Sequence, residues 1–147
     1  MVDWNTPFEE LPIGKGRKLR DGKKIAILSI GHMGNTVAEA IEELAKSGIT
    51  PAHYDLRFVK PLDTELLHQV MQEYPDIITI EDGTLIGGMG SAVVEFASDN
   101  NYKVNIHRMG IPDRFIDQGT PEELFREIGL DQEGIFNNIN QIFNRNK

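Results

Sequence analysis

Two carboxylates and a run of glycines stand together in the middle of the chain, where they could bind a ligand. The apolar segment 77–80 is followed directly by Glu81 and Asp82. A turn rich in glycine comes next, with Gly87, Gly88 and Gly90. The apolar run is typical of a strand buried on both faces of a parallel sheet. Glycines after such a strand let the backbone approach a phosphate, another subunit or a neighbouring loop.

The glycine turn departs from a dinucleotide-binding fingerprint. That fingerprint needs the spacing G-x-G-x-x-G, but Val93 occupies the third position after Gly88 and Gly90. Arg108 stands about where an acidic residue is expected, roughly 20 residues further on. The sequence also has no Walker lysine. We therefore favour close backbone packing at this turn, with a phosphate- or nucleotide-binding module as the alternative.

Glu81 and Asp82 are poorly placed to act as a catalytic acid–base pair. Adjacent residues on a strand point to opposite faces, so both reach one centre only if the strand has already ended. α/β proteins do place ligands at the carboxyl ends of strands. A carboxylate at such a position more often caps a helix or braces a loop, and that is the role we expect.

Arg57, Lys60 and Asp63 form a second candidate group. Arg57 follows an apolar strand, Pro61 suits a turn, and Asp63 can cap the helix after it. The guanidinium would therefore project from a rigid base. Two interpretations stay open: Arg57 pairs with Asp63 or Glu81 to brace the loops, or it faces a partner domain.

Metal and thiol chemistry find no support in the residue pattern. The chain contains no cysteine, which removes disulfides, thiolate catalysis and zinc–cysteine sites. Its four histidines share no helix face at ligand spacing; they are His32, His53, His68 and His107. No G-x-S-x-G nucleophile elbow is present. We expect no metal site here.

Length and charge narrow the function classes. With 147 residues, we expect one domain over residues 14–147, preceded by a linker or arm at 1–13 that carries Trp4 and Phe8. The formal charge of −8 disfavours nucleic acid and anionic membranes as partners. No apolar run approaches the roughly 18 residues of a membrane span, and no secretory signal opens the sequence. We therefore expect a cytoplasmic protein.

Strand and helix patterns alternate along the chain. We expect strands near residues 17–20, 24–30, 51–57, 77–80 and 103–109. Helices should begin near Asn35 or Thr36, after Asp63, near Ser91 and after Thr120, with a last helix carrying Ile135, Ile139, Ile142 and Phe143 on one face. Asp21-Gly22 should join the first two strands as an antiparallel pair, with the charged strand at the sheet edge. This order predicts a three-layer α/β domain.

Five segments, taken in order, carry a family resemblance. They are Leu11–Gly16, Asp55–Asp63, Glu81-Asp-Gly with Gly87–Ser91, Ile111–Thr120 and Gly129–Asp131. From about Phe8 onward, the chain resembles the C-terminal domains of the 1-deoxy-D-xylulose-5-phosphate synthase family, within the transketolase-like superfamily. The second and third segments fit any such C-terminal domain, including that of the pyruvate dehydrogenase β subunit. The first and fourth point to the synthase family.

The resemblance implies a fold and a parent enzyme. C-terminal domains of this family have an α/β/α arrangement around a five-stranded mixed sheet, mostly parallel with one antiparallel edge strand. The parent condenses pyruvate with glyceraldehyde 3-phosphate, using thiamine diphosphate and Mg²⁺, at the first step of non-mevalonate isoprenoid synthesis. It also has a diphosphate-binding N-terminal domain and a pyrimidine-binding domain, and it is expected to form a homodimer.

The resemblance carries no catalytic residue onto this chain. The magnesium motif, the glutamate that activates the thiazolium and the ketose-binding histidines belong to the two other domains. We therefore expect no catalytic, cofactor-binding or metal-binding residue here, and no turnover by the chain alone. Its work would be to pack against the pyrimidine-binding domain and the twofold partner. The interface candidates are Arg57, Lys60, Asp63, Glu81, Asp82, Gly87, Gly88 and Gly90.

Overall fold

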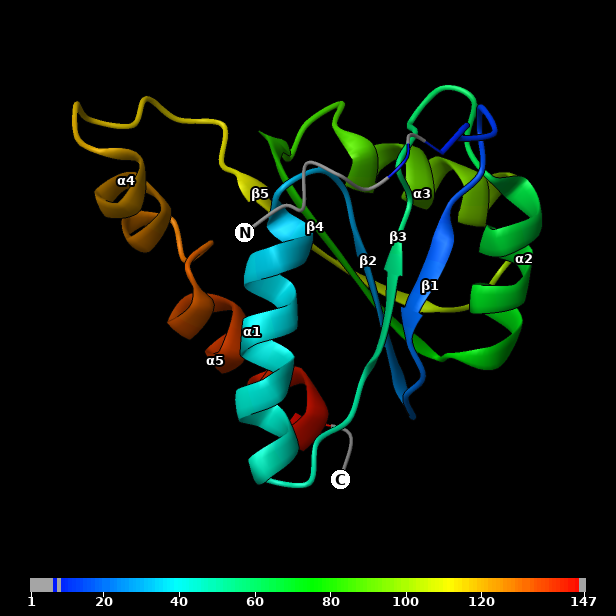
Figure 1. Ribbon diagram of the computed structural model, residues 1–147, viewed down its shortest axis with the longest axis horizontal. Coiled ribbons are helices and arrows are strands. Elements are labelled where there is room, and N and C mark those ends of the chain that lie inside the picture. The colour runs from blue at the N-terminus through cyan, green and yellow to red at the C-terminus, as the bar shows by residue number, and fades with distance from the viewer. Residues whose placement is uncertain (1–6, 8, 146–147) are drawn as a thin grey trace.

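The computed structural model describes residue 7 and residues 9–145. Its strands are β1 (Arg17–Arg20), β2 (Ile25–Ser29), β3 (Ala52–Asp55), β4 (Asp76–Thr84) and β5 (Asn105–Ile111). Its helices are α1 (Met33–Lys46), α2 (Thr64–Glu73), α3 (Met89–Asp99), α4 (Pro121–Glu127) and α5 (Gln132–Arg145). Figure 1 shows the sheet in the middle of the molecule, with α1 and α5 on one side and α2 and α3 on the other.

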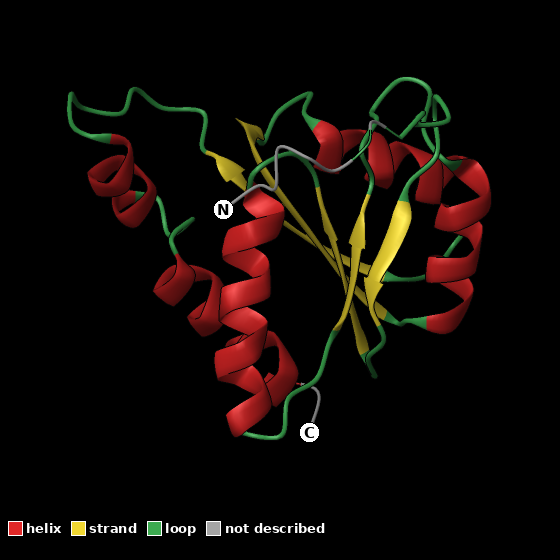
Figure 2. Cartoon of the chain, viewed as in Figure 1, coloured by secondary structure: helices red, strands yellow, loops and turns green. Residues whose placement is uncertain are grey.

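The strands form one mixed sheet in the order β1-β3-β2-β4-β5. All neighbouring pairs are parallel except β1 with β3. The predicted α/β/α fold, with a charged antiparallel strand at one edge, is therefore confirmed. Parallel strands place all their carboxyl ends along one edge of the sheet, which gathers the loops that follow β2, β3, β4 and β5 (Figure 2).

Alternation along the central strands produces two cores. On β2, Ile25 and Ile27 pack under α1 and α5, whereas Ala26 and Leu28 pack under α2 and α3. All four side chains are at most 1% exposed. β2 is buried on both faces for this reason, as its apolar run indicates. The final helix buries Ile135, Ile139 and Ile142 against the first of these cores, which confirms its expected apolar face.

The predicted antiparallel pairing of the first two strands is wrong. β1 pairs with β3 instead, with Arg17 opposite Asp55. The segment after β1 crosses the start of β3: Lys23 N donates to Thr50 O, and a Cβ on Gly22 would lie 2.0 Å from Ala52 N. Both edges of β2 are taken by the buried strands β3 and β4, which leaves the charged strand only the outer position.

Two helices start earlier than their local sequences predict. α1 begins at Met33, with His32 at its N-cap and no side-chain cap, although Asn35 and Thr36 are better capping residues. Met33 is 1% exposed, so burial of this side chain extends the helix toward β2. α3 begins at Met89 rather than near Ser91, because a carboxylate from another element satisfies its first N–H groups.

The helix starts that the sequence predicts after Asp63 and Thr120 are confirmed. Asp63 caps α2 by accepting a hydrogen bond from Leu66 N, and Thr120 and Glu123 form a capping box at α4. Gly48 follows α1 with a φ of +76°, in the left-handed region that glycine adopts freely. The expected aromatic anchors Trp4 and Phe8 lie outside the described residues. Among the described residues, no helix is both long and apolar enough to cross a bilayer.

His53 is a buried polar residue of the sheet. It is 2% exposed, and its Nε2 lies 2.8 Å from Ser29 Oγ on the adjacent strand. Burial lowers the pKa of His53 to about 4, because the protonated ring would lose its hydration; nearby Arg20 adds to this effect and Asp55 opposes it.

We predict that stability falls as the pH falls from 7 to 5. The unfolded chain takes up a proton at His53 near pH 6.5, whereas the folded chain resists protonation until about pH 4, so acid favours the unfolded state. The loss should be about 2 kcal/mol over this window. Urea denaturation at each pH measures it. A His53→Gln variant should show a flatter profile, and parallel profiles for the two proteins would contradict the prediction.

Candidate domain interface at the carboxyl edge of the sheet

Glu81 lies inside the protein and caps α3. It is 4% exposed, and its Oε2 and Oε1 accept hydrogen bonds from Met89 N at 2.7 Å and Gly90 N at 2.8 Å. The positive end of the helix dipole therefore meets a carboxylate that is almost entirely buried. The expected helix-capping role is therefore confirmed for Glu81.

The glycine turn is packed against this carboxylate. A Cβ on Gly88 would lie 2.2 Å from Thr84 O and 2.4 Å from Glu81 Oε2, and one on Gly90 would lie 2.5 Å from Thr79 Oγ1. Gly87 has open space around it but a φ of +78°. Gly88 and Gly90 are thus required by close packing, and Gly87 by backbone conformation. The expected close approach of the backbone at this turn is confirmed.

Arg108 ties the same turn to the edge strand β5. Its guanidinium donates to Leu85 O at 2.7 Å and to Ser91 Oγ at 2.9 Å. Ser91 Oγ in turn donates to Leu85 O and accepts from Gly87 N. The residue that replaces the acidic position of a dinucleotide fingerprint therefore braces the turn.

Asp82 differs from Glu81 because it faces outward. β4 continues to Thr84, so the two carboxylates do leave the strand in different directions, as expected. Asp82 Oδ2 lies 3.2 Å from Nδ1 of His32, and both side chains are about half exposed. This pair links the loop after β2 to the end of β4 on the surface of the carboxyl edge.

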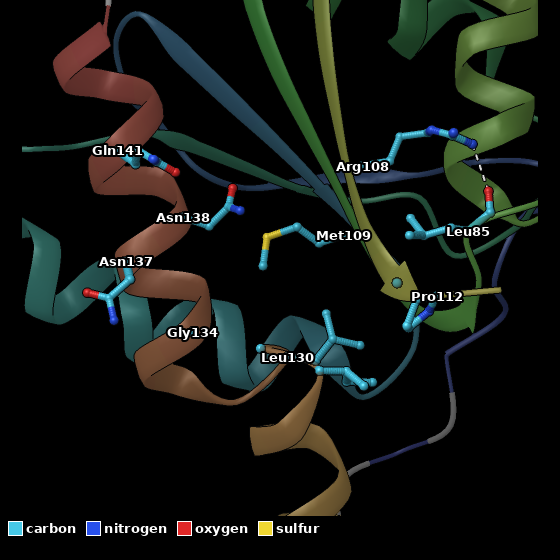
Figure 3. Close-up of a pocket in the computed structure, with 12 residues that line it drawn as sticks. Leu85, Arg108, Met109, Pro112, Leu130, Gly134, Asn137, Asn138 and Gln141 are labelled. Carbon is cyan, nitrogen blue, oxygen red and sulfur yellow. Dashed lines mark hydrogen bonds between the residues drawn. The ribbon is translucent and has the colours of Figure 1, made fainter. Parts of the chain in front are cut away.

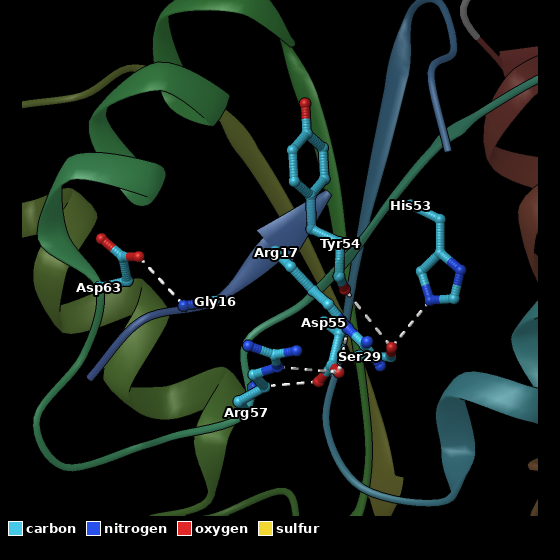
Figure 4. Close-up of polar contacts among 8 residues, drawn as sticks. All are labelled: Gly16, Arg17, Ser29, His53, Tyr54, Asp55, Arg57 and Asp63. Atoms are coloured by element: carbon cyan, nitrogen blue, oxygen red, sulfur yellow. Dashed lines mark hydrogen bonds and ion pairs between the residues drawn. The ribbon is translucent and has the colours of Figure 1, made fainter. Parts of the chain in front are cut away.

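Asp63 holds the segment before β1 onto the start of α2. Its Oδ2 accepts from Gly16 N at 3.0 Å while Oδ1 accepts from Leu66 N at 3.1 Å (Figure 4). Lys15 Nζ lies 3.5 Å from Oδ1 and 2.6 Å from Glu65 Oε2. Both carboxylate oxygens of Asp63 therefore have a structural role.

Arg57 braces its own loop, but neither of its two expected partners is used. Its main-chain N donates to Asp55 Oδ1 at 3.0 Å, and its Nε lies 3.9 Å from Asp55 Oδ2. Arg17 reaches the same carboxylate at 3.2 Å from across the sheet edge (Figure 4). Asp55, rather than Asp63 or Glu81, is the carboxylate that forms ion pairs with Arg17 and Arg57. Lys60 is exposed in the loop that follows.

The candidate residues thus form two groups along one edge. Glu81 and the glycine turn lie at β4 and α3, whereas Arg57 and Asp63 flank the loop between β3 and α2. The sequence did not predict the structural roles of Asp55, Arg108 and His53. The alternation of β3 held a signal for two of them: Ala52 and Tyr54 face the core under α2 and α3, so His53 and Asp55, which alternate with them, must face the other side.

A cavity of about 490 Å³ lies apart from most of these residues, between β5 and α5. Figure 3 shows Asn138 on α5 and Met109 on β5 across this space, with Asn137 and Gln141 on either side of Asn138 along the helix. The walls are mixed apolar and amide groups, and Arg108 is the charged residue among them. None of the predicted interface residues lines this cavity.

The thiamine diphosphate and Mg²⁺ of the implied parent do not fit the described residues. In residue 7 and residues 9–145, no group of three or more His, Asp or Glu side chains could hold a metal ion. The N–H groups of Met89 and Gly90, which would suit a diphosphate, already bind Glu81. No reaction step through either group follows from these residues.

Fold and site together define a class of protein. Residues 14–135 match the family described as the C-terminal domain of transketolase, and the chain belongs to this family. The predicted boundaries at residues 13/14 and 147 stay predictions.

The relatives are more specific. The chain is 52% identical, over 97% of its length, to 1-deoxy-D-xylulose-5-phosphate synthase of Cytophaga hutchinsonii, and 53% identical over 92% to the synthase of Bacteroides fragilis. It spans only 22% and 21% of these proteins. The shared part is their C-terminal region, so the resemblance to the C-terminal domain of the synthase is confirmed.

Solved structures agree with the fold. A protein titled split gene transketolase, inactive beta4 tetramer, is similar with a TM-score of 0.84 and 29% identity, covering 95% of this chain and 46% of that one. Transketolase from Campylobacter jejuni gives 0.66 at 16% identity, covering 93% of this chain and 20% of that one, and supports the fold alone.

We predict that Glu81→Gln lowers the free energy of unfolding by about 2 kcal/mol, because a neutral amide replaces a buried carboxylate that accepts two N–H groups. Asp82→Asn is the matched control on the same strand. Its exposed pair with His32 should contribute no more than about 0.5 kcal/mol. Chemical denaturation measures both, and equal losses would contradict the capping role.

Gly88→Ala and Gly87→Ala separate packing from backbone conformation in the same turn. The new methyl group at residue 88 meets Thr84 O and Glu81, so we expect a loss of about 3 kcal/mol. At residue 87 only the left-handed backbone is penalised, by about 1 kcal/mol. Thermal and urea unfolding compare the two. A larger effect at residue 87 would mean that the turn is not closely packed.

Proposed function

We propose that this chain is the C-terminal domain of a 1-deoxy-D-xylulose-5-phosphate synthase and that it supports assembly rather than chemistry. The parent would condense pyruvate with glyceraldehyde 3-phosphate and release carbon dioxide. The observation that carries this proposal is identity of about half over nearly the whole chain, confined to about a fifth of each relative.

The site chemistry supports a role in assembly. The buried Glu81 occupies the first N–H groups of α3, and Asp63 is used on both sides by Gly16 and Leu66. These N–H groups and the Asp63 carboxylate, which could have bound a cofactor, instead hold loops in place. Thiamine diphosphate, Mg²⁺ and the catalytic residues would come from the preceding domains of the parent, and the isolated chain would be inactive.

We propose the carboxyl edge as the contact with the pyrimidine-binding domain or the twofold partner. Buried Asp63, Glu81 and Gly90, with the partly buried Gly88, would support this surface from inside the protein. The side chains that could touch a partner are the exposed ones, Lys60 and Asp82 with the neighbouring Ile86, which is 67% exposed. A large apolar side chain beside charged groups suits the edge of an interface.

The oligomeric and cellular parts of the proposal follow from the same family. One similar structure is an inactive tetramer by its title, which supports assembly of such a chain without activity. For the intact parent we propose a homodimer in the cytoplasm, with no nucleic acid or membrane as partner.

Two other functions remain as competitors. A C-terminal domain of a pyruvate dehydrogenase β-type subunit would share the arginine and glycine segments, but the synthases match the chain at 52% and 53% identity. A free-standing phosphate- or nucleotide-binding module would use the glycine turn. The N–H groups of Met89 and Gly90 are already bonded to Glu81, which argues against that use.

A domain exchange tests the proposal. The C-terminal region of the Cytophaga hutchinsonii synthase is replaced by this chain, and formation of deoxyxylulose phosphate is measured. We expect the hybrid to retain at least about a tenth of the synthase rate, because the two C-terminal regions are about half identical. The synthase without this region, and this chain alone, should both be inactive.

The matched control replaces the same region with the corresponding domain of Campylobacter jejuni transketolase, which shares the fold at 16% sequence identity. This second hybrid should be inactive or fail to assemble. A folded first hybrid that binds thiamine diphosphate normally yet forms no product would count against the proposed parent. Product formation by the 147-residue chain alone would refute the non-catalytic role.

A further inference from the structure

The strand β5 forms one free edge of the sheet. The strand order places it last, with β4 as its neighbour among the described strands. Asn105 N donates to Pro75 O on the β4 side. Main-chain groups alternate in direction along a strand, so those of Ile106, Arg108 and Gly110 point away from β4. These three residues therefore present unpaired N–H and C=O groups at the outer edge of the sheet.

The two edges of the sheet are protected to different degrees. β1, at the opposite edge, is a short strand that carries Arg17, Lys18 and Arg20, and its pairing with β3 is interrupted by a register shift. Charges and bulges of this kind prevent an edge from pairing with another chain. β5 contains no lysine and no proline, and its register with β4 is regular over residues 105–109. Its outer edge is therefore the one that is open to pairing.

The cavity of about 490 Å³ between β5 and α5 lies along this free edge. Arg108 and Met109 both line it, although consecutive side chains point to opposite faces of a sheet. A single cavity can reach both side chains only at the edge of the strand, where the unpaired main-chain groups lie. Figure 3 shows this space, with the guanidinium of Arg108 turned toward Leu85. The volume lies within the range of ligand sites, roughly 300–1,000 Å³.

The wall opposite β5 carries neutral amide groups. Asn137, Asn138 and Gln141 line the cavity from α5. Asn138 Oδ1 is buried and has no hydrogen-bond partner among the described residues. A buried polar atom of this kind is uncommon unless water or a ligand meets it. Side-chain amides offer an acceptor oxygen and two donor hydrogens, which match the N–H and C=O groups of a peptide main chain.

We propose that this groove binds an extended peptide segment of another protein, which adds to the outer edge of β5 as a further strand. The main chain of the segment pairs with Arg108 and Gly110, and one of its amide groups meets Asn138. Small or apolar side chains of the segment face Met109 and Leu130, which form an apolar part of the wall. The row of main-chain groups favours a peptide over a small molecule, because only a peptide repeats their spacing. The groove does not depend on the identity of the parent enzyme.

Hydrogen exchange of the 147-residue chain, followed by ¹⁵N NMR, tests the groove. The probe is a neutral, end-blocked peptide of alternating serine and valine, added to about 10 mM because main-chain pairing tolerates many sequences but binds weakly. We expect exchange at the amides of Arg108 and Gly110 to slow at least about fivefold. The amide of Met109 faces β4 and should not change, which makes it the control within the same strand. Absence of protection at Arg108 and Gly110 would overturn the proposal.

A second peptide separates strand pairing from other kinds of contact. It has the same side chains but carries N-methyl groups on the residues that face β5, so it cannot donate to the edge and should give no protection. Equal protection by the two peptides would contradict strand addition. Protection in the free chain that rises with protein concentration would assign the edge to a second copy, which would also overturn the proposal.

Two substitutions on α5 test the amide wall. Asn138→Leu should weaken binding of the first peptide at least about threefold, because the contact with its side-chain amide is lost. Asn140→Leu is the matched control, since Asn140 lies on the same helix but outside the groove. Unchanged spectra elsewhere establish that both variants fold. Equal weakening by the two substitutions would contradict the placement of the peptide between β5 and α5.

Discussion

The carboxylate of Glu81 lies beneath the first turn of α3 and accepts hydrogen bonds from the main-chain N–H groups of Met89 and Gly90. Two glycines make this possible, since a Cβ on Gly88 or Gly90 would collide with the groups around it. The end of β4, the glycine turn and the start of α3 are therefore held together as one rigid unit. The rest of the carboxyl edge is arranged around this unit, with Arg108 bracing it from β5 and the Asp82–His32 pair joining it to the loop after β2.

This arrangement supports the assembly role that we propose for a fold well suited to binding phosphates. In open α/β sheets, the glycine turn and the helix after it usually offer free N–H groups to an anion. Here the anion is the carboxylate of Glu81, which braces the edge and leaves these N–H groups unavailable to a ligand. A preformed surface costs less conformational entropy when a partner docks on it, which suits the proposed role of packing against other domains.

The N-terminal ends of α3 and α1 lie on the same edge of the sheet, and their first N–H groups are satisfied in different ways. α3 is capped by the buried carboxylate of Glu81, whereas at the start of α1 Gly34 N and Asn35 N donate to Gly31 O and His32 O of the preceding turn. Both are consequences of the strand order β1-β3-β2-β4-β5, which sends the connection after β2 to one face and those after its neighbours to the other.

The sequence by itself determined the alternation of strands and helices, the α/β class, the caps at Asp63 and Thr120 and the family. The alternation, the class and the caps depend on contacts within a few residues or on side-chain periodicity, whereas the family was indicated by the resemblance of five segments to known C-terminal domains. Only the tertiary structure decided that β1 pairs with β3 and that α1 and α3 begin earlier than their local sequences predict. It also decided that Asp55 forms ion pairs with Arg17 and Arg57. Those outcomes depend on which distant segments become neighbours: the hydrogen bond from Gly16 N to Asp63, for example, joins residues 47 positions apart. A carboxylate or an edge strand has many possible partners along the sequence, and burial of the two cores selects among them.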